Sequence, residues 1–353
     1  MTLQAIDAAG AAARLASFSA VIDARSESEF AEDHLPGAVN WPSLDDEERA
    51  LVGTIYKQVS PFEARKRGAA LVLANISRHL EREVMDKPRD WQPLVYCWRG
   101  GKRSGVLADL LSQVGFRTAV VSGGYKAFRS HVLAELPALA QRLHYRVVCG
   151  LTGSGKTRLL HALASEGAQV LDLEALAQHR GSVLGLEPGT RQPTQKHFDM
   201  RVWEHLRSFD PRRPVYVESE SKKVGNVAVP EALIHSMRAS PCVRIELPLE
   251  SRVDLLLEDY DWFLRDPAFF CDRLRALTQL RGAAVVKDWE EKVHAGAFRD
   301  VFRDLLERHY DPGYAASLAR NFKCSADAPM LAPAGHGTDA MREVARQLVA
   351  GDG

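Results

Sequence analysis

The chain has 353 residues, which is enough for two domains with separate cores. Its 46% hydrophobic content is typical of a globular protein, and 46 basic residues balance 46 acidic ones, so overall charge does not point to a nucleic-acid partner. The five cysteines are scattered without a C-x-x-C pair, which argues against a disulfide framework or a zinc site. No stretch approaches the roughly 18 apolar residues of a membrane span, so we expect a cytoplasmic protein that does not associate with membranes.

Charge is distributed unevenly along the N-terminal third. Residues 57–103 hold eleven basic and five acidic residues, whereas residues 23–48 hold nine acidic and one basic. This asymmetry indicates either a basic face on a neutral protein or ordinary solvated surface.

Short strands alternate with helices in the first part of the chain. A turn at Pro36-Gly37 leads into the second strand, and Gly115 suits a helix C-terminus. The alternation favours a parallel α/β sheet. The expected strands are within residues 20–23, 34–42, 94–97 and 118–121, and the expected helices are residues 61–85 and a helix from Val106.

A second α/β pattern begins after a connecting helix expected at residues 130–144. After Pro248 the apolar spacing becomes mainly helical, and the last ten or so residues are expected to fray. We therefore predict a rhodanese-like parallel-sheet domain at residues 1–135, and a P-loop α/β domain with a helical C-terminal extension at residues 136–353. The expected strands of the second domain are residues 146–149, 169–174 and 215–219.

A phosphate-binding motif, GLTGSGKT from Gly150, follows the strand at residues 146–149 and precedes a helix. It matches G-x-x-x-x-G-K-[ST] in full and in the required context, which argues against a chance glycine-rich turn. Backbone N–H groups of the loop are expected to converge on phosphate oxygens, with Lys156 neutralising a terminal phosphate and Thr157 a candidate Mg²⁺ ligand. The candidate phosphate-binding residues are Gly150, Gly153, Ser154, Gly155, Lys156 and Thr157.

The motif indicates phosphate but not ATP in particular. An ATPase also needs an acidic residue at a strand end, for which Asp172, Glu218 and Glu220 are candidates. None of the three follows the usual long apolar run. The acidic residues therefore leave nucleotide hydrolysis open. We expect no requirement for ATP.

A cysteine loop occupies the corresponding place in the first domain. Cys97 ends the strand at residues 94–97, and the loop after it is basic and contains glycines. Positive charge and inward-pointing N–H groups favour a thiolate, which can attack sulfur or selenium or carry either as a persulfide-type adduct. A buried structural cysteine is the alternative. The residues expected to bind anions in this loop are Arg99, Gly100, Gly101, Lys102, Arg103 and Ser104.

Weaker candidates lie elsewhere. His179 and Arg180 suit an anion-binding turn, and Glu218 and Glu220 suit a metal or basic group, although each pair also fits ordinary polar surface. For an RNA partner, residues 65–67 (Arg-Lys-Arg) offer basic charge and Trp98 offers a stacking ring. The helical tail with Tyr260, Trp262, Arg265 and Arg273 either completes an RNA surface or caps the second domain.

Several segments carry a family resemblance. Asp-Ala-Arg at 23–25, HLPGAVNWP at 34–42 and CWRGG at 97–101 resemble the rhodanese family, in which the loop cysteine carries sulfur. Such a domain fused directly to GLTGSGKT is similar to the tRNA 2-selenouridine synthase family, and the resemblance covers nearly the whole chain. The further matching segments are HRGS at 179–182, RQPTQ at 191–195 with Gln192 as a candidate substrate contact, VESES at 217–221 and HYDP at 309–312.

The resemblance implies a two-step reaction on tRNA that carries 2-thiouridine at the wobble position. The family first alkylates the sulfur with geranyl diphosphate and then replaces the S-geranyl group with selenium from selenophosphate. It implies that Cys97 acts in the selenium step and that the phosphate loop holds one or both co-substrates. We expect no stable protein partner.

The sequence is also compatible with two other functions. A thiosulfate-type sulfurtransferase with a regulatory nucleotide-binding domain would bind ATP or GTP tightly and transfer sulfur to cyanide without tRNA. A non-enzymatic tRNA-binding or sulfur-relay adaptor would bind tRNA but yield no modified product.

Overall fold

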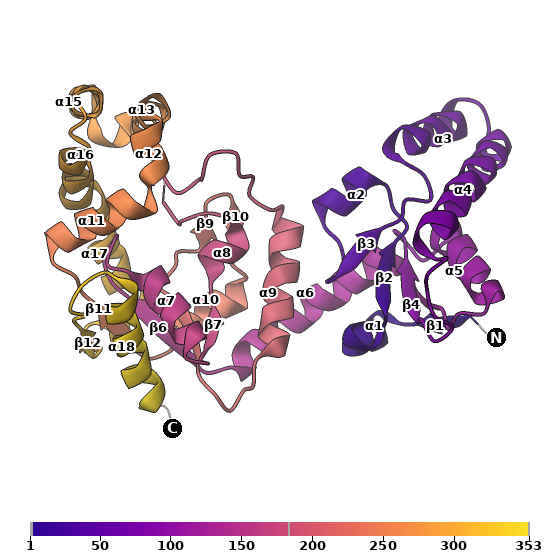
Figure 1. The fold of residues 1–353 in the computed structure, drawn as a ribbon, viewed down its shortest axis with the longest axis horizontal. Helices are drawn as coiled ribbons and strands as arrows, with labels where there is room; N and C mark the ends of the chain where they lie inside the picture. The colour runs from indigo at the N-terminus through magenta and orange to yellow at the C-terminus, as the bar shows by residue number, and fades with distance from the viewer. Residues whose placement is uncertain (1–2, 183, 352–353) are drawn as a thin grey trace. The chain divides into compact units, whose positions relative to one another are not determined.

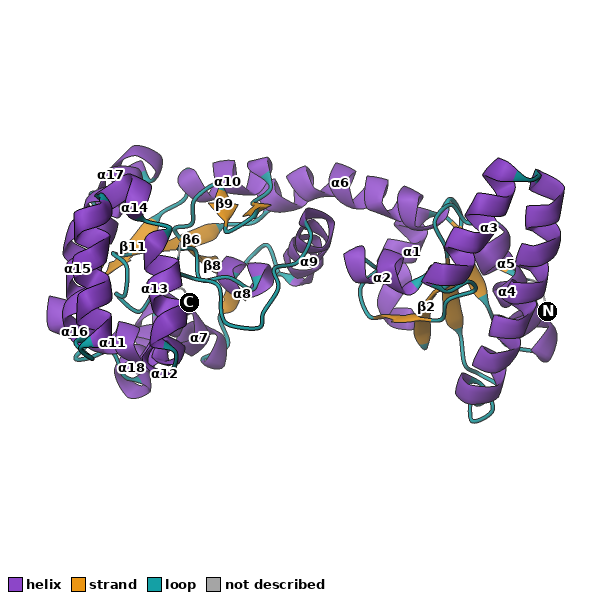
Figure 2. Cartoon of the chain, turned by 90° about the horizontal axis from the view of Figure 1, so that it is seen from above, coloured by secondary structure: helices purple, strands orange, loops and turns teal. Residues whose placement is uncertain are grey.

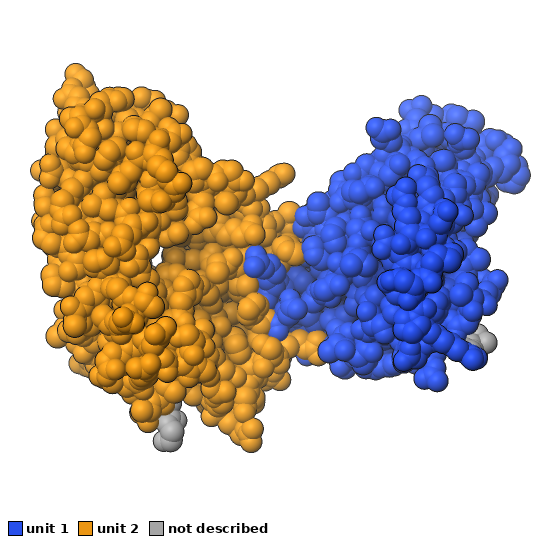
Figure 3. Space-filling model, in the orientation of Figure 1, with its two compact units in different colours: residues 1–135, 199–204 blue, residues 136–198, 205–353 orange. Residues whose placement is uncertain are grey.

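The computed structural model describes residues 3–182 and 184–351 of the chain. The chain divides into two units, of which unit 1 comprises residues 1–135 and 199–204 and unit 2 the remainder (Figure 3). Each unit contains a five-stranded sheet, and every pairing in these two sheets is parallel. The α/β class and the parallel sheets predicted from the sequence are confirmed.

The sheet of unit 1 has the strand order β1-β5-β4-β2-β3. Strands β1, β2, β3 and β4 carry labels in Figure 1. All four residues of β4 are buried, as expected for a central parallel strand covered on both faces. Val95 of this strand packs in one core cluster with Trp41, Trp91, Leu107 and Leu111. The strands are β1 (Gln4–Ile6), β2 (Ala20–Asp23), β3 (Ala38–Asn40), β4 (Pro93–Tyr96) and β5 (Ala119–Val121).

The helices of unit 1 start earlier than predicted at two places. The helix expected from Val106 begins at Lys102, because its first turn is polar and glycine-containing and gives no apolar periodicity. The connecting helix expected at residues 130–144 begins at Gly124 and continues into unit 2. The helices are α1 (Ala8–Arg14), η1 (Leu15–Ser17), α2 (Glu27–Glu32), α3 (Asp46–Gln58), α4 (Pro61–Glu83), α5 (Lys102–Val114) and α6 (Gly124–Arg142).

The sheet of unit 2 has the order β12-β11-β6-β8-β7, with the strand that precedes the phosphate loop in the centre. The strand expected at residues 169–174 ends at Leu171, because Asp172 caps the next helix through a 2.8 Å hydrogen bond from the Ala175 N–H. The strands are β6 (Tyr145–Cys149), β7 (Gln169–Leu171), β8 (Val215–Glu218), β11 (Cys242–Ile245) and β12 (Met330–Leu331), and a separate antiparallel pair joins β9 (Lys223–Val224) to β10 (Val227–Ala228).

The chain after Pro248 is mainly helical, as predicted, and an aromatic cluster with Phe263, Phe270, Trp289 and Phe302 forms its core. Helix α9 (Gln195–Ser208) contributes residues 199–204 to unit 1 and its other residues to unit 2. The other helices of unit 2 are α7 (Lys156–Ser165), α8 (Leu173–Ala177), α10 (Glu231–Arg238), α11 (Leu249–Asp259), α12 (Asp261–Arg265), α13 (Pro267–Arg275), α14 (Thr278–Arg281), α15 (Ala283–His294), α16 (Phe298–Asp304), η2 (Leu305–Tyr310), α17 (Asp311–Asn321), η3 (Lys323–Ser325) and α18 (Thr338–Ala350).

Helix α18 extends into the last ten or so residues, for which we predict fraying. It continues to Ala350 and buries Met341, Val344 and Ala345 against the sheet core of unit 2, while residues 352–353 of the predicted segment lie outside the described part of the chain. Its apolar face therefore anchors it. In the described part of the chain, no helix is both long enough and apolar enough to cross a membrane.

Candidate functional site

The thiol loop lies at the carboxyl end of β4, where parallel sheets commonly hold ligands. The Cys97 side chain is only 3% exposed, and its sulfur accepts a 3.1 Å hydrogen bond from the Ser104 hydroxyl on the first turn of α5. The structure thus brings together two of the predicted residues, the thiol and a hydroxyl donor.

The N-terminus of α6 fastens the thiol loop from the other side. The N–H groups of Tyr125 and Lys126 donate to the carbonyls of Cys97 and Trp98 at 2.8 and 3.0 Å. Gly124 has φ +60°, and a Cβ atom there would lie 2.1 Å from the Cys97 carbonyl oxygen. Only glycine fits this close approach.

The charged residues of the thiol loop differ in their environments. Arg99 and Lys102 are exposed, whereas Arg103 donates to the Glu29 carboxylate at 2.9 Å. Arg49 also approaches this carboxylate, at 3.1 Å, so Glu29 balances only part of the positive charge of Arg103. Trp98, predicted as a stacking platform, already stacks on Tyr125 with ring centroids 5.4 Å apart.

A buried polar network supports the loop. Arg25, which is 1% exposed, forms an ion pair with Asp23 and lies over the Tyr125 ring at 4.1 Å. The Tyr125 hydroxyl donates to Asp33 at 2.6 Å, and Arg25 donates to the carbonyl of the same aspartate. Because every charge has a partner, this network can fix the start of α6, and hence the thiol loop, in one arrangement.

In unit 2 the phosphate loop links β6 to α7. Gly155 is the N-cap residue of α7 and has φ +87°, a conformation that glycine adopts readily. This conformation allows backbone N–H groups of the loop to point toward an anion at the N-terminus of α7. The Lys156 ammonium donates to the carbonyls of Gly150 and Leu151 at 2.8 and 3.1 Å and lies 4.8 Å from the centre of the Tyr314 ring. Burial lowers the pKa of Lys156, although the charges of nearby carboxylates oppose this effect.

Arg252 of α11 holds the phosphate loop to α17. Its guanidinium donates to the Thr152 carbonyl at 2.8 and 2.9 Å and forms a bidentate pair with Asp311 at 2.6 and 3.0 Å. The residue is 5% exposed. A buried, fully paired arginine of this kind fixes both partners, and sequence reasoning did not identify it.

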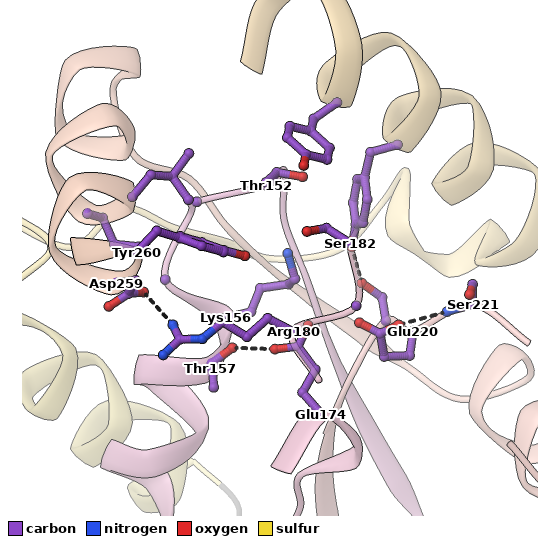
Figure 4. A pocket seen from close by; sticks show the side chains of 18 of the residues that line it. Thr152, Lys156, Thr157, Glu174, Arg180, Ser182, Glu220, Ser221, Asp259 and Tyr260 are labelled. Atoms are coloured by element: carbon purple, nitrogen blue, oxygen red, sulfur yellow. Dashed lines mark hydrogen bonds and ion pairs between the residues drawn. The ribbon is translucent and has the colours of Figure 1, made fainter. Parts of the chain in front are cut away.

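A cavity of about 390 Å³ opens over the phosphate loop (Figure 4). Lys156, Glu174 and Glu220 point toward this common space, and the Thr157 hydroxyl donates to Glu174 at 3.2 Å. Tyr260 and Tyr314 contribute aromatic walls. The cavity therefore combines a cation, phosphate-binding backbone and carboxyl groups.

Burial raises the pKa values of the carboxyl groups at and beneath the base of this cavity. Burial and the charge of Glu220 raise the pKa of Glu174 to about 8. Burial also raises the pKa values of Glu218 and Glu220. Glu218 is 2% exposed and accepts a 3.0 Å hydrogen bond from the Glu174 N–H, so it positions α8 rather than lining the cavity.

A second cavity, of about 680 Å³, shares Thr157, Glu174 and Arg180 with the first. Arg180 pairs with Glu187 at 3.0 Å and lies 5.3 Å from the ring centre of Tyr260. His179 lines the second cavity but not the first. Burial and the charge of Arg273 lower the pKa of His179.

Gln192 lies outside the lining of both cavities. It donates to the carbonyls of Ala177 and Val224 at 3.1 and 3.0 Å and accepts from the Asn226 N–H at 2.8 Å. These bonds tie the end of α8 to the β9–β10 turn. The structure thus gives Gln192 a supporting position, away from the predicted phosphate contacts.

A third cavity, of about 560 Å³, lies on the other flank of the phosphate loop, which contributes Gly150, Leu151 and Ser154 to its wall. The end of β11 and residues of α17 form much of the remaining wall, in which apolar side chains alternate with the charged side chains of Arg244, Glu246, Arg252 and Lys323. Its apolar lining residues include Leu151, Ile245, Leu247, Ala315, Leu318 and Ala319.

The site fits Mg²⁺ as a companion of a bound phosphate. Thr157 and Glu174 supply a hydroxyl and a carboxyl within hydrogen-bond distance, and Mg²⁺ in proteins commonly uses one or two such oxygens together with phosphate and water. Among the described residues, no group of three or more His, Cys, Asp or Glu side chains is arranged to hold a metal ion.

These features define a class of protein, in which an α/β unit with a cysteine loop after a central strand is joined to a P-loop unit. Residues 7–131 match the family described as the rhodanese-like domain. Residues 143–266 match the family described as the tRNA 2-selenouridine synthase AAA domain.

Relatives extend the comparison over most of the chain. A tRNA 2-selenouridine synthase of Nitrosomonas europaea is 38% identical over 72% of this chain and 66% of its own length, slightly under two thirds. One of Hydrogenovibrio crunogenus is 32% identical over 87% of this chain and 91% of its own. This chain belongs to the tRNA 2-selenouridine synthase family.

Among solved structures, the N-terminal domain of a putative ATP/GTP binding protein from Clostridium difficile is 32% identical. The match covers 37% of this chain and 99% of that domain, with a TM-score of 0.32.

Proposed function

We propose that this protein converts the wobble 2-thiouridine of tRNA to 2-selenouridine in two steps. The first is geranylation of the sulfur by geranyl diphosphate, and the second is replacement of the S-geranyl group by selenium from selenophosphate. Membership of the family supports the overall conversion. The individual steps rest on the chemistry of the two loops.

The observation that carries the geranyl step is the composition of the first cavity. It offers Lys156 and the N-terminus of α7 to a diphosphate, and its wall includes the apolar and aromatic side chains of Leu255, Leu256, Tyr260 and Tyr314. A diphosphate that carries an apolar chain matches this combination of charge and apolar surface. Mg²⁺ held by Thr157 and Glu174 would supply further charge neutralisation of the diphosphate.

Geranyl transfer forms a bond between the thiouridine sulfur and the first carbon of the chain, and it breaks the bond from that carbon to the diphosphate oxygen. The diphosphate leaves with the bonding electrons, while the uridine N3–H gives up its proton. Lys156 and the loop N–H groups stabilise the negative charge that develops on the leaving group. In the second step, selenium bonds to the base carbon that carries the sulfur, the Se–P bond of selenophosphate is hydrolysed to inorganic phosphate, and the C–S bond breaks. The sulfur departs as geranyl thiol, a better leaving group than an unalkylated thiocarbonyl sulfur.

We assign Cys97 to the selenium step. Its thiol lies at the end of a central strand, receives a hydrogen bond from Ser104, and lies beside two exposed cationic residues, Arg99 and Lys102. This environment suits an anionic sulfur or selenium group.

The test is mass spectrometry of nucleosides from 2-thiouridine-containing tRNA after incubation with the protein, geranyl diphosphate and selenophosphate, with no nucleotide added. We expect S-geranyl-2-thiouridine first and 2-selenouridine afterwards. If neither product forms with or without ATP, and the protein instead transfers thiosulfate sulfur to cyanide, the sulfurtransferase reading replaces this one. Binding of tRNA without any product would favour the adaptor reading.

A further inference from the structure

The helical hairpin of α3 and α4 is held to unit 1 mainly at its base. The two helices lie side by side (Figure 2), and Val52 approaches Gly68 across them. No residue of α3 is buried, and the buried residues of α4 in the half near the tip are two small ones, Ala64 and Gly68. We call residues 50–72 the distal hairpin. The distal hairpin buries little apolar surface, so packing in the core of unit 1 does not account for the types of side chain found there.

Charge is segregated along this hairpin. The distal hairpin has four basic residues and one acidic residue, Glu63. Among the described residues, Lys57, Arg65 and Arg67 form no ion pair, while Lys66 pairs with Glu63 at 2.8 Å. The base of the hairpin, by contrast, begins with three successive acidic residues at 46–48.

Aromatic rings lie among these cations. Tyr56 is 57% exposed and Phe62 is 61% exposed, and they are the two aromatic side chains among the large exposed hydrophobic residues of the described chain. Val59 between them is 69% exposed. The Lys66 ammonium lies 5.1 Å from the centre of the Phe62 ring, so charge and ring form one surface.

We propose that the distal hairpin is an RNA-docking surface that binds the phosphate backbone through its unpaired cations and stacks unpaired bases on Tyr56 and Phe62. Proteins bind unpaired nucleotides with this combination of cationic surface and exposed rings. The excess of four basic residues over one acidic residue favours a polyanionic partner, such as RNA, over a protein surface of mixed charge. The proposal rests on the proposed function, which makes tRNA the occupant.

The experiment measures binding of the full-length protein to 2-thiouridine-containing tRNA by fluorescence anisotropy at several salt concentrations. The charge variant is Lys57→Gln/Arg65→Gln/Arg67→Gln, and its matched control is Arg78→Gln/Arg82→Gln/Lys87→Gln, which removes three charges near the base. Loss of three phosphate contacts should reduce the slope of log affinity against log salt by about 2 to 3. The control should keep the slope of the parent.

The ring variant is Tyr56→Ala/Phe62→Ala. Loss of stacking should weaken tRNA binding by about 5-fold or more at every salt concentration, with the salt slope unchanged. Tyr56→Phe/Phe62→Tyr keeps both rings and should bind as the parent does, as should Met85→Ala, which shortens another exposed apolar side chain. Thermal unfolding curves check that each variant is folded.

Folded charge and ring variants that bind tRNA within twofold of the parent, with the parental salt slope, would overturn the proposal. A second result would also overturn it. If light scattering shows that the parent is a dimer and that the variants are monomers with unchanged tRNA binding, the hairpin is a self-association surface. The parent is assayed for tRNA binding and for product in the same series. A parent that neither binds nor modifies tRNA refutes the proposed function itself, whereas an active parent with unaffected hairpin variants refutes the hairpin alone.

Discussion

Burial and a single hydroxyl define the surroundings of the Cys97 sulfur. Ser104 donates to it from α5, and the backbone of the loop is fixed by α6 through the Cys97 carbonyl. Under the proposed function, the reaction partner has to approach this buried sulfur through a loop whose exposed side chains include Arg99 and Lys102. Because these two side chains are positively charged, we predict an anionic reaction partner for this thiol.

Replacement of the thiol separates the two chemical steps. Cys97→Ser should abolish formation of 2-selenouridine and leave S-geranyl-2-thiouridine to accumulate at nearly the parental rate, because geranyl transfer uses the phosphate loop. Nucleoside mass spectrometry measures both products. Cys324→Ser, at an exposed cysteine in η3, is the control and should support both steps. Loss of both steps in Cys97→Ser would contradict the assignment.

Glu174 should make stability depend on pH in a defined direction. Its pKa is raised from an ordinary value of 4.5 to about 8, chiefly by burial. The folded protein therefore retains a proton that the unfolded chain loses. The resulting stability is present in full below about pH 4.5 and is lost as the pH rises through about 8.

We expect Glu174→Gln, which stays neutral, to lack this loss. Its melting temperature relative to the parent should rise between pH 5 and pH 8.5, by about 3 °C or more, in ligand-free protein. Differential scanning calorimetry measures this difference. Glu231→Gln, at a side chain that is 87% exposed, should show a constant difference over the same range. A pH-independent difference for Glu174→Gln would show that its carboxyl is not protonated in the folded state.

At the scale of elements, the junction of β4, α5 and α6 determines where the thiol lies. The loop after β4 and the first residues of α6 approach so closely that backbone packs on backbone at Gly124. The loop after β4 and the start of α6, which are separated in the chain by α5 and β5, are thus in direct contact. The polar network of Arg25, Asp33 and Tyr125 supports this junction.

A Cβ atom at this junction should therefore be costly. Gly124→Ala should lower the free energy of unfolding by about 2 kcal/mol or more, because the residue has a positive φ and its Cβ atom would collide with backbone atoms. Chemical denaturation measures the loss. Gly105→Ala is a matched control within helix α5, where a Cβ atom meets nothing within 4 Å, and it should be neutral or slightly stabilising. Equal stability of the two variants would contradict the close approach.

At the scale of the whole molecule, one chain carries a thiol loop in unit 1 and a phosphate loop in unit 2. If the phosphate loop holds a diphosphate leaving group rather than a nucleotide, inorganic diphosphate should inhibit geranyl transfer and added ATP should not accelerate it. Product formation at increasing diphosphate concentrations measures the inhibition. Lys156→Ala should reduce geranyl transfer by about 100-fold or more and weaken the inhibition, since it removes the main cation of the cavity. Undiminished transfer by Lys156→Ala, or strict dependence on ATP, would contradict this reading.

Local sequence determined the identity of both loops and most of the strands. GLTGSGKT and CWRGGKRS depend on residue types at fixed spacing, and short buried strands such as residues 20–23 are visible as apolar runs. Helices without a buried face were not visible, and α3 is the clearest case because it has no buried residue. The early start of α5 was missed for a related reason, since its first turn is polar.

Only the tertiary structure decided which distant groups surround the phosphate loop. Glu174, Arg252 and Tyr314 come from three separate helices and carry no motif, yet they meet around the phosphate loop. Their contribution depends on burial and on distances between segments far apart in the chain, which local patterns do not encode. The spacing of glycines and a lysine suffices to predict a phosphate loop because the loop folds from consecutive residues. The group of buried carboxyl side chains, the hydrogen bonds from Arg252 to the loop and the cavities beside the loop form only when the sheet and the C-terminal helices have packed together.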